Sequence, residues 1–284
     1  MNTSESDTKT LIGTEPTPLT AISRRGMLRQ TGLLGGTLVA GLPLTAAEVA
    51  PLAGQPEQVK KRLKVVVAGG HPGDPEYGCG GTIARFTELG HEVILLYLNE
   101  GEWGDTPAAT RLAEAKKACE ILKARPMYVG QRNGHAIVDE SHYDQFAKLL
   151  QAEGPDALIT QWPLDNHRDH RAISMLAFDA WRQSGRKFSL YYYEVSNGED
   201  TIQFAPSHYV DITDAEPSKR AACYAHASQT PDHYYRLQDQ VAVFRGLEGG
   251  YKRAEAFVGL VQNPFDAWSV FADQARLHPP QNAK

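Results

Sequence analysis

Residues 64–84 read KVVVAGGHPGDPEYGCGGTIA, and this stretch decides the fold class. The β-branched run at 64–68 ends in Gly69 and Gly70, which is typical of a short buried strand. After the polar loop that follows, the pattern predicts a helix over 78–89. A strand that leads through a polar loop into a helix is the repeating unit of an α/β fold, in which helices cover a parallel sheet.

The same alternation continues through the rest of the chain. Short apolar runs predict further strands at 91–98, 127–129, 156–162, 189–195 and 208–212. Apolar residues at helical spacing predict helices at 110–123, 143–152, 171–181, 218–227 and 235–244. The pattern predicts one Rossmann-like α/β domain over 60–275, with a mostly parallel sheet and helices on both faces.

The composition is that of a folded protein with a slight excess of acidic side chains. The chain has 284 residues, 42% of them hydrophobic and 22% charged, and a formal net charge of −5 at pH 7. Surfaces that bind nucleic acid concentrate basic side chains, so this balance argues against a nucleic-acid partner. The cysteines Cys79, Cys119 and Cys223 form no CxxC pair, and their spacing leaves the disulfide state open.

The first fifty residues are typical of a disordered N-terminus followed by an export signal. Residues 1–22 are rich in Ser, Thr, Glu and Pro and have no apolar period. The basic segment 23–29, the Gly-rich apolar stretch 32–44 and the small residues Ala46 and Ala47 then follow in the order of a twin-arginine-type signal peptide. The alternative is a basic loop before an amphipathic helix, which the glycines disfavour. We expect an exported protein, periplasmic or secreted, and no stable membrane anchor, because the apolar stretch is too short to span a bilayer.

Two polar loops follow predicted strands and are rich in histidine and aspartate. The first, at 69–76, reads GGHPGDPE, and the second, at 163–170, reads PLDNHRDH. In open parallel sheets, the loops that leave the carboxyl ends of the strands gather at one edge. We therefore expect these two loops to face each other.

The residue types in these loops are those of a catalytic metal site. His71 and Asp74 offer one nitrogen and one oxygen from a single loop, and the pair His167 and His170 can add a third ligand. Catalytic zinc commonly takes three such ligands and keeps an open position for water. A metal bound there would lower the pKa of its water towards about 7 and polarise a scissile carbonyl. Iron, cobalt or nickel suit the same donors.

Each loop by itself has a simpler explanation. A His-Pro pair is commonly part of a turn, and Asp169 can cap the helix that follows the second loop. A nucleotide-binding oxidoreductase is a further alternative, because Gly78, Gly80 and Gly81 open a helix. In a dinucleotide site the glycines follow the strand directly, whereas here HPGDPEY intervenes, so we reject that alternative. The two loops together favour the metal site.

With these motifs in place, the chain resembles the LmbE-like (PIG-L) zinc-dependent N-acetylglucosaminyl deacetylases. The resemblance rests on GGHPGDPEYGCGGTIA at 69–84, LNEGEWG at 98–104 and NHRDHRA at 166–172, and shorter matches extend it over about 63–260. It implies an LmbE-like fold and a hydrolase that removes an N-acetyl or other acyl group from an amino sugar or glycoconjugate. The substrate within that class and the oligomeric state are left open.

The resemblance also implies roles for residues of the two loops. By position, His71, Asp74 and His170 would hold Zn²⁺ or another divalent transition metal. His167 falls where the family has a histidine that assists charge or proton transfer, and Asp169 would orient it. These two are therefore the expected catalytic residues.

Three further side chains are expected to bind the substrate. Glu102 and Arg111 match family positions near the sugar. Trp103 lies in the loop after the strand at 91–98, where an indole face can serve as a platform for a sugar ring. Packing against the sheet edge is the alternative explanation for Trp103 and for Trp162.

One residue departs from the family pattern. The family motif HPDD places a general-base aspartate where this chain has Gly73, which cannot accept a proton. A general base of this kind increases the reaction rate by about 10²–10⁴-fold. Three explanations for the missing aspartate are open. In the first, another base takes its place, with Glu76, Glu102 or the His167–Asp169 pair as candidates. In the second, the substrate supplies its own proton acceptor. The third is a catalytically impaired, exported, metal-dependent carbohydrate-binding protein. In the active form, we expect His167 to stabilise the oxyanion and to protonate the leaving amine.

Overall fold

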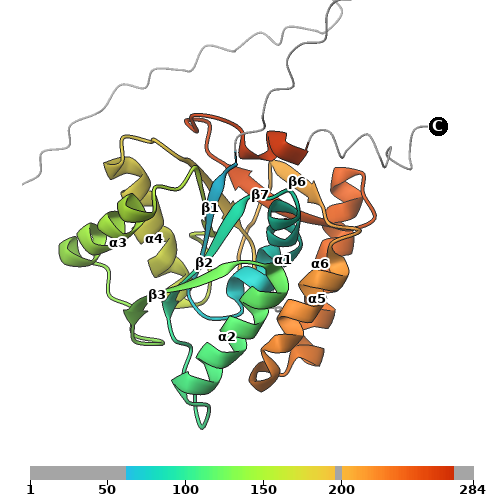
Figure 1. Cartoon of the computed structure of the whole chain (residues 1–284), viewed down its shortest axis with the longest axis horizontal. Coiled ribbons are helices and arrows are strands. Elements are labelled where there is room, and N and C mark those ends of the chain that lie inside the picture. Colours follow the sequence, from blue (N-terminus) through green and yellow to red (C-terminus); the bar gives the residue numbers. More distant parts are fainter. Residues whose placement is uncertain (1–61, 196–199, 272–284) are drawn as a thin grey trace, which may run out of the picture. The chain divides into compact units, whose positions relative to one another are not determined.

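The computed structural model describes residues 62–195 and 200–271, which form an α/β unit around one sheet (Figure 1). The strands are β1 (Lys64–Gly69), β2 (Glu92–Asn99), β3 (Arg125–Gln131), β4 (Ala157–Gln161), β5 (Ser189–Tyr193), β6 (His208–Asp211) and β7 (Ala254–Gly259). The helices are α1 (Asp74–Glu88), α2 (Ala108–Leu122), α3 (Glu140–Glu153), α4 (Arg168–Gln183), α5 (Glu216–Ala225) and α6 (Pro231–Gly249), with short 3₁₀ helices η1 (Ala227–Gln229) and η2 (Ala267–Phe271). The predicted export signal at 1–50 lies outside the described residues.

The sheet has seven strands in the order β3-β2-β1-β4-β5-β7-β6. Strands β1 to β5 run parallel, and β7 pairs antiparallel with both β5 and β6. The predicted mostly parallel α/β architecture is confirmed.

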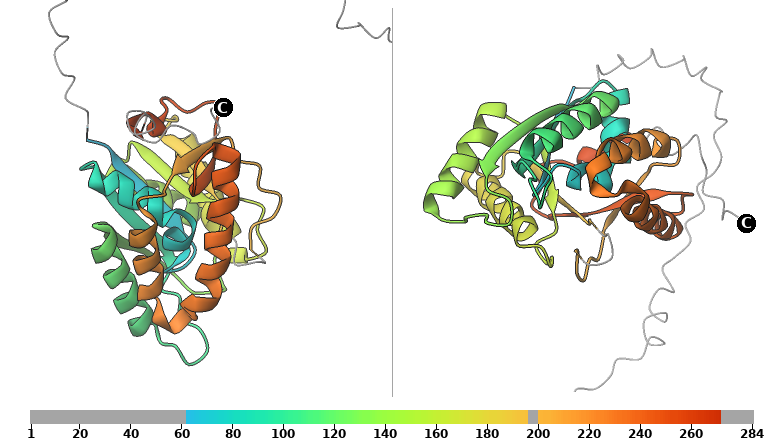
Figure 2. Two further views of the ribbon diagram at one scale, coloured as in Figure 1. Left: turned by 90° about the vertical axis from the view of Figure 1, so that its right-hand side faces the viewer. Right: turned by 90° about the horizontal axis from the view of Figure 1, so that it is seen from below.

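Helices cover both faces of the sheet (Figures 1 and 2). One hydrophobic core lies under α1, α2 and α5, and a second lies under α3 and α4. Strand β5 shows how the sheet contributes to both, because Tyr191 and Tyr193 belong to the first core and Tyr192 to the second. Successive side chains of a strand point to opposite faces, so all three tyrosines are buried.

Helix α1 begins at Asp74, four residues before the predicted start at Gly78. Proline suits the first turn of a helix, and Pro75 occupies that turn. The helix is kinked at Cys79, whose φ of −142° is not helical. Just after the kink, the backbone N–H groups of Gly81 and Thr82 donate to the Glu255 carboxylate at 2.9 and 2.7 Å. The predicted start therefore coincided with the second half of a kinked helix.

Strand β7 was not predicted, because its sequence, AEAFVG, opens with residues that are uncommon in strands. Its position depends on a long-range contact. The Glu255 carboxylate accepts a hydrogen bond from Lys219 of α5 at 2.6 Å, and both side chains are buried. Through Glu255, β7 is therefore bonded to both α1 and α5, the helices that cover this face of the sheet.

The topology places the two predicted loops side by side. From β1 the chain moves to β2 and β3 on one side, and then crosses back to β4 on the other side of β1. In such sheets, the point where the strand order reverses leaves a crevice at the carboxyl ends of the strands. The loop after β1 and the loop after β4 border this crevice.

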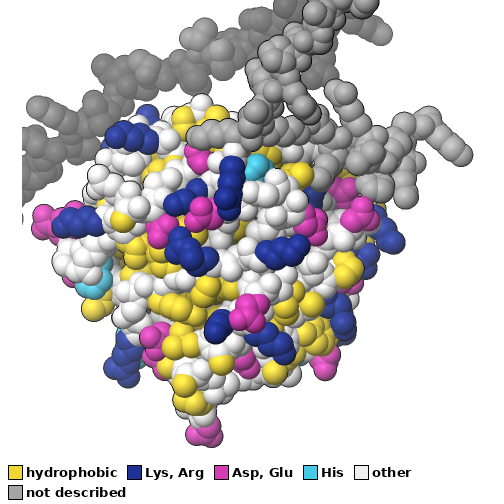
Figure 3. Space-filling view, viewed as in Figure 1, with side chains coloured by type: hydrophobic (Ala, Val, Ile, Leu, Met, Phe, Trp, Pro, Cys, Tyr) yellow, Lys and Arg dark blue, Asp and Glu magenta, His cyan; other side chains and the backbone are white. Residues whose placement is uncertain are grey.

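The three cysteines are free and buried, which resolves the disulfide question for the described residues. Burial raises the pKa of the Cys79 thiol well above its ordinary value, so it is not an activated nucleophile. In the described part of the chain, none of the helices has the length and apolar character needed to cross a membrane. On the face drawn in Figure 3, basic and acidic side chains are interspersed.

Candidate metal centre

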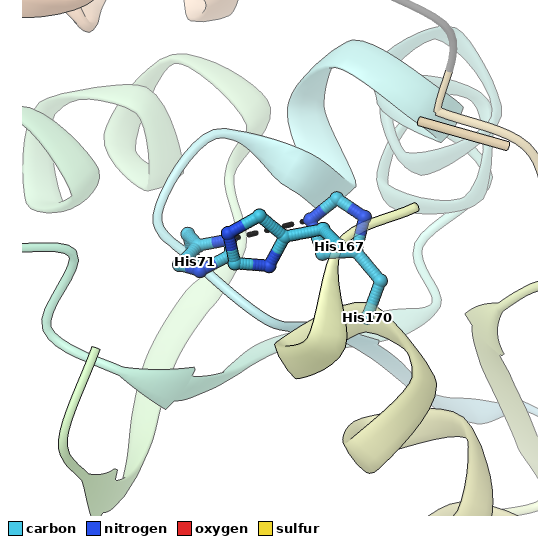
Figure 4. A group of neighbouring side chains, drawn as sticks. All are labelled: His71, His167 and His170. Atoms are coloured by element: carbon cyan, nitrogen blue, oxygen red, sulfur yellow. Dashed lines mark hydrogen bonds between the residues drawn. The ribbon is translucent and has the colours of Figure 1, made fainter. Parts of the chain in front are cut away.

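Three side-chain atoms of the two loops converge on one point. Asp74 Oδ2 lies 3.1 Å from His71 Nδ1 and 3.2 Å from His170 Nε2, and the two nitrogens are 3.3 Å apart. In Figure 4, the dashed line joins the imidazole of His71, from the loop after β1, to that of His170, from the first turn of α4. Around a tetrahedral ion with bonds of about 2.0–2.1 Å, ligand atoms lie roughly 3.3 Å from one another. The spacing of this donor set therefore fits a tetrahedral divalent metal with one further position open.

The other nitrogen of each imidazole contacts a second carboxylate. His71 Nε2 lies 3.2 Å from Asp169 Oδ2, and His170 Nδ1 lies 3.0 Å from Asp165 Oδ1. A carboxylate at one ring nitrogen holds the proton there and leaves the lone pair of the other nitrogen free for a metal. Both imidazoles are thus oriented with their free nitrogens towards Asp74.

The contact of Asp169 corrects one expectation. Its carboxylate bonds to His71 and accepts hydrogen bonds from Asn99 Nδ2 at 3.0 Å and from the Gly134 backbone at 2.7 Å. Its contact with His167 is made by the backbone, since the Asp169 N–H donates to His167 Nδ1 at 3.3 Å. Asp169 therefore orients the metal-site histidine His71, and not His167 as the family resemblance implied.

His167 lies at the edge of the same cluster. Its ring meets that of His71 edge to face, with 4.5 Å between ring centres. One nitrogen from each of His71, His167 and His170 lies within 4.8 Å of the others, so a three-histidine set is a second possible arrangement. The Asp74 oxygen lies 3.1 and 3.2 Å from the His71 and His170 nitrogens, and Nδ1 of His167 is already the N-cap acceptor of α4. The geometry favours Asp74 as the third donor.

The charges of the site favour a bound cation. Burial opposes the charged forms, but His170 and His71 lower the pKa of Asp74 well below its ordinary value. Burial also opposes a charged imidazole, yet Asp74 and Asp165 outweigh it and raise the pKa of His170 to about 10. For His167, burial and the neighbouring histidines lower the pKa, so its imidazole is neutral near pH 7. The carboxylates thus create a negative potential where the donor atoms meet.

A pocket of about 550 Å³ opens over the donor atoms. Its lining includes His71, Asp74, His167 and His170, together with Pro72, Gly73, Tyr77, Gly101, Trp103, Arg111, Asn133, Val195, Asp200, Gln229, Tyr234 and Gln238. The volume is within the range of pockets for small ligands. Of the side chains expected to bind substrate, Trp103 and Arg111 line it.

Arg111 joins the two sides of the pocket floor. Its guanidinium donates to the backbone carbonyls of Pro72 and Gly101, and it forms an ion pair with Glu114 at 2.8 Å. The side chain is buried, at 2% exposure. Arg111 therefore holds the loop that carries His71 against the loop after β2.

Glu102 and the two tryptophans occupy different environments. Glu102 is outside the pocket lining, and its carboxylate accepts the Asn133 backbone N–H at 3.3 Å. Trp103 is 76% exposed at the rim. Trp162 donates from Nε1 to the Ile202 carbonyl at 3.1 Å and packs against Tyr192. The packing explanation therefore applies to Trp162 but not to Trp103.

The candidate replacements for the missing base are mostly engaged elsewhere. Gly73 has a φ of +112°, which few residues other than glycine adopt. Glu76 is wholly buried and bonds to Tyr97 at 2.7 Å, His226 at 3.0 Å and the Gly73 N–H at 3.1 Å. It supports the loop from below and does not line the pocket.

Sequence reasoning missed three residues of this region. Asp165 stands in the second loop, and an acid five residues before His170 could have been considered as its partner. Asn99 ends β2 at the same sheet edge, which was a usable signal for a contact with Asp169. Asp200 lines the pocket from a segment that carries no recognisable motif.

Comparisons of sequence and structure find similar proteins. The family model described as PIG-L, GlcNAc-PI de-N-acetylase, matches residues 65–181. A diacetylchitobiose deacetylase from Thermococcus kodakarensis is 26% identical over 216 residues, which cover 68% of this chain and 81% of that enzyme. The conserved protein TT1542 from Thermus thermophilus has a structure with a TM-score of 0.65 and 27% identity, covering 72% of this chain and 98% of its own.

A second solved structure agrees with this chain in fold. The N,N'-diacetylchitobiose deacetylase from Pyrococcus horikoshii has a TM-score of 0.62 at 24% identity, covering 72% of this chain and 88% of its own. The residues matched by the family model, 65–181, include both loops of the candidate metal centre. Over residues 65–181 the chain is therefore similar to the PIG-L/LmbE-like deacetylase family, and its fold agrees with that similarity.

Proposed function

We propose that this protein is a metal-dependent hydrolase that removes an N-acetyl group from an amino sugar or glycoconjugate. The observation that carries the proposal is the convergence of one carboxylate oxygen and two imidazole nitrogens at mutual distances of 3.1–3.3 Å. The matched family model, described as a GlcNAc-PI de-N-acetylase, and the Thermococcus diacetylchitobiose deacetylase support this substrate class.

His71, Asp74 and His170 would hold the metal, and we propose Zn²⁺ because two nitrogens and one carboxylate oxygen are a common set for catalytic zinc. When bound, such an ion activates water for attack and polarises the acyl oxygen. Asp169 and Asp165 keep the two imidazoles in the binding tautomer and orientation. Arg111 keeps the loops that carry these groups together.

His167 supplies a hydrogen-bond donor in the pocket. Its Nδ1 accepts the Asp169 N–H, so the proton of the neutral imidazole resides on Nε2. A neutral imidazole N–H can stabilise the negative charge that develops on the acyl oxygen. Trp103 at the rim offers an exposed indole face for a sugar ring.

Metal analysis and amine release test the proposal together. Purified protein should contain close to one equivalent of metal and release amine from members of a panel of N-acetylated amino sugars, including diacetylchitobiose. Treatment with a chelator should abolish release, and adding Zn²⁺ should restore it. His170→Ala should lose both metal and activity, whereas Asp144→Asn, on the exposed face of α3, should retain both. Stoichiometric metal without amine release from any member of the panel would contradict the proposal.

We also infer that the protein is exported, on the support of the sequence at 23–47 alone. N-terminal sequencing of protein recovered from outside the cytoplasm tests this. A mature chain that starts after the apolar stretch is expected, and a cytoplasmic protein with an intact N-terminus would contradict it.

A further inference from the structure

The pocket over the metal centre is lined by two carboxylates among the described residues. One is Asp74, whose oxygen belongs to the metal-binding donor set. The other is Asp200, which follows β5 in the chain and lines the same pocket as Gly73. Hydrolysis of an amide by activated water needs a group that accepts a proton from that water. Asp74 cannot serve while it holds a metal.

The other candidate bases are excluded by their contacts. Glu76 is buried beneath the loop and Glu102 bonds to Asn133 outside the pocket. Asp169 is committed to His71 and two backbone N–H groups. His167 lines the pocket, but the proton on its Nε2 makes the exposed nitrogen a donor and not an acceptor.

The backbone around Asp200 is fixed to the loop of the metal centre. The Asp200 carbonyl accepts the Asn166 N–H at 2.7 Å, and Thr201 forms a β-bridge with Asp165. The Thr201 hydroxyl also donates to Asp165 Oδ2 at 3.2 Å, and Asp165 is the carboxylate that orients His170. Asp200 is thus adjacent to Thr201, which bonds to Asp165, and Asp165 in turn bonds to the metal-site histidine His170.

The surroundings of Asp200 suit a group that exchanges protons near neutral pH. Its side chain is half-buried, and burial is the largest cause that raises its pKa, to about 6. In the balance that gives this value, His170 and His71 lower the pKa, whereas the carboxylates of Asp74 and Asp165 act in the same direction as burial. A base whose pKa is close to the working pH is the most effective one.

We propose that Asp200 is the general base of the reaction and takes the place of the side chain that Gly73 lacks. This inference rests on the proposed function. The water oxygen forms a bond to the acyl carbon while a water proton passes to the Asp200 carboxylate. The carbon–nitrogen bond then breaks, its electron pair goes to nitrogen, and Asp200 returns the proton to that nitrogen. The products are a carboxylic acid, ionised at neutral pH, and an amine, and Asp200 is again ionised.

This assignment changes the expected part of His167. A neutral imidazole is a poor proton donor to an amine, so the proton on the leaving nitrogen comes from Asp200. His167 keeps the hydrogen bond to the acyl oxygen in both steps.

The test compares Asp200→Asn, Asp200→Glu and the control Asp144→Asn with the wild type. Asp200→Asn should lower kcat for amine release by at least about 100-fold with little change in KM, and should remove the acidic limb of the pH profile. Asp200→Glu should recover part of the activity, and Asp144→Asn should match the wild type. Metal content and melting temperature should be unchanged in all variants.

A second readout does not depend on turnover. Difference infrared spectroscopy of metal-free protein, wild type minus Asp200→Asn, should show a carboxylic acid carbonyl band that titrates near pH 6. Activity of Asp200→Asn within about threefold of wild type, loss of metal in that variant, or absence of the band would overturn the assignment of Asp200 alone. A wild type that releases no amine overturns the proposed function, and the general-base role with it.

Discussion

Asp165 Oδ1 lies 3.0 Å from His170 Nδ1, and this contact determines which nitrogen of the imidazole faces Asp74. Asp165 is buried and its other oxygen accepts the Thr201 hydroxyl at 3.2 Å, so the carboxylate is itself held in place. The structure therefore gives Asp165 a positioning role at the centre, although it would not touch the metal.

Asp165→Asn should weaken metal binding by about 10–100-fold, because the amide carries no charge to hold the proton on Nδ1 of His170. Competition with a chromogenic chelator measures this affinity. The fold should persist, so the circular dichroism spectrum should match that of wild type. Unchanged affinity would show that His170 is oriented by its packing alone.

Gly73→Ala and Gly73→Asp should each lower the free energy of unfolding by about 1–3 kcal/mol, because a side chain at a φ of +112° is strained. Crowding is a minor factor, since the nearest atom to an added Cβ is a ring carbon of Tyr77 at 3.7 Å. Urea unfolding of both variants measures the loss, and equal losses identify the backbone as the cause. Wild-type stability in both variants would contradict this prediction and would show that the loop relaxes around the new side chain.

Gly73→Asp also distinguishes a hydrolase from a carbohydrate-binding protein. If Asp200 is the base, an aspartate at position 73 is redundant and should raise kcat by no more than a few-fold. An inactive wild type that gains amine release through Gly73→Asp would instead identify a binding protein that has lost its base.

Trp103→Ala should raise KM for a sugar substrate several-fold, as expected for the loss of about 1 kcal/mol of stacking, and leave stability within about 0.5 kcal/mol. The indole is 76% exposed, so it contributes little to the fold. Trp162→Ala is the matched control, because that indole packs against Tyr192 and Phe204. It should lower the melting temperature instead. A Trp103→Ala enzyme with wild-type KM would exclude the platform role.

Lys219→Met should destabilise the fold by about 3–5 kcal/mol, because it leaves the Glu255 carboxylate buried without its cation. Lys219 and Glu255 are 2.6 Å apart, and both are almost fully buried. The double variant Lys219→Met with Glu255→Gln should recover part of the loss, which chemical denaturation can measure. A single variant as stable as wild type would show that the ion pair is not needed to hold β7.

The parts of the centre that could be predicted from sequence are those fixed by topology. His71 and His170 follow strands whose carboxyl ends share one edge, so their meeting required only the α/β pattern. The partner of Asp169 could not be predicted, because it depends on the orientation of the His71 ring. Asp200 was out of reach for a similar reason, since it joins the pocket through its bridge to the loop after β4 and not through a motif.

The elements were predicted best where the apolar pattern was strong. Strand β7 was missed because its stability comes from its neighbours and from Glu255, and not from its own residues. The start of α1 was misplaced because glycines at its kink resemble a helix start. Glu102 was expected at the sugar, but the fold uses its carboxylate to hold the Asn133 turn.

The pairing of β1 with β4 has a consequence for the order of folding and metal binding. His71 and Asp74 come from the first half of the sheet and His170 from the second, so the donor atoms assemble only after the central strands have paired. A cation that recognises this set binds the native state and not the unfolded chain, which adds to the stability of the native state through mass action. Occupancy of the proposed metal site would therefore indicate that β1 and β4 have paired.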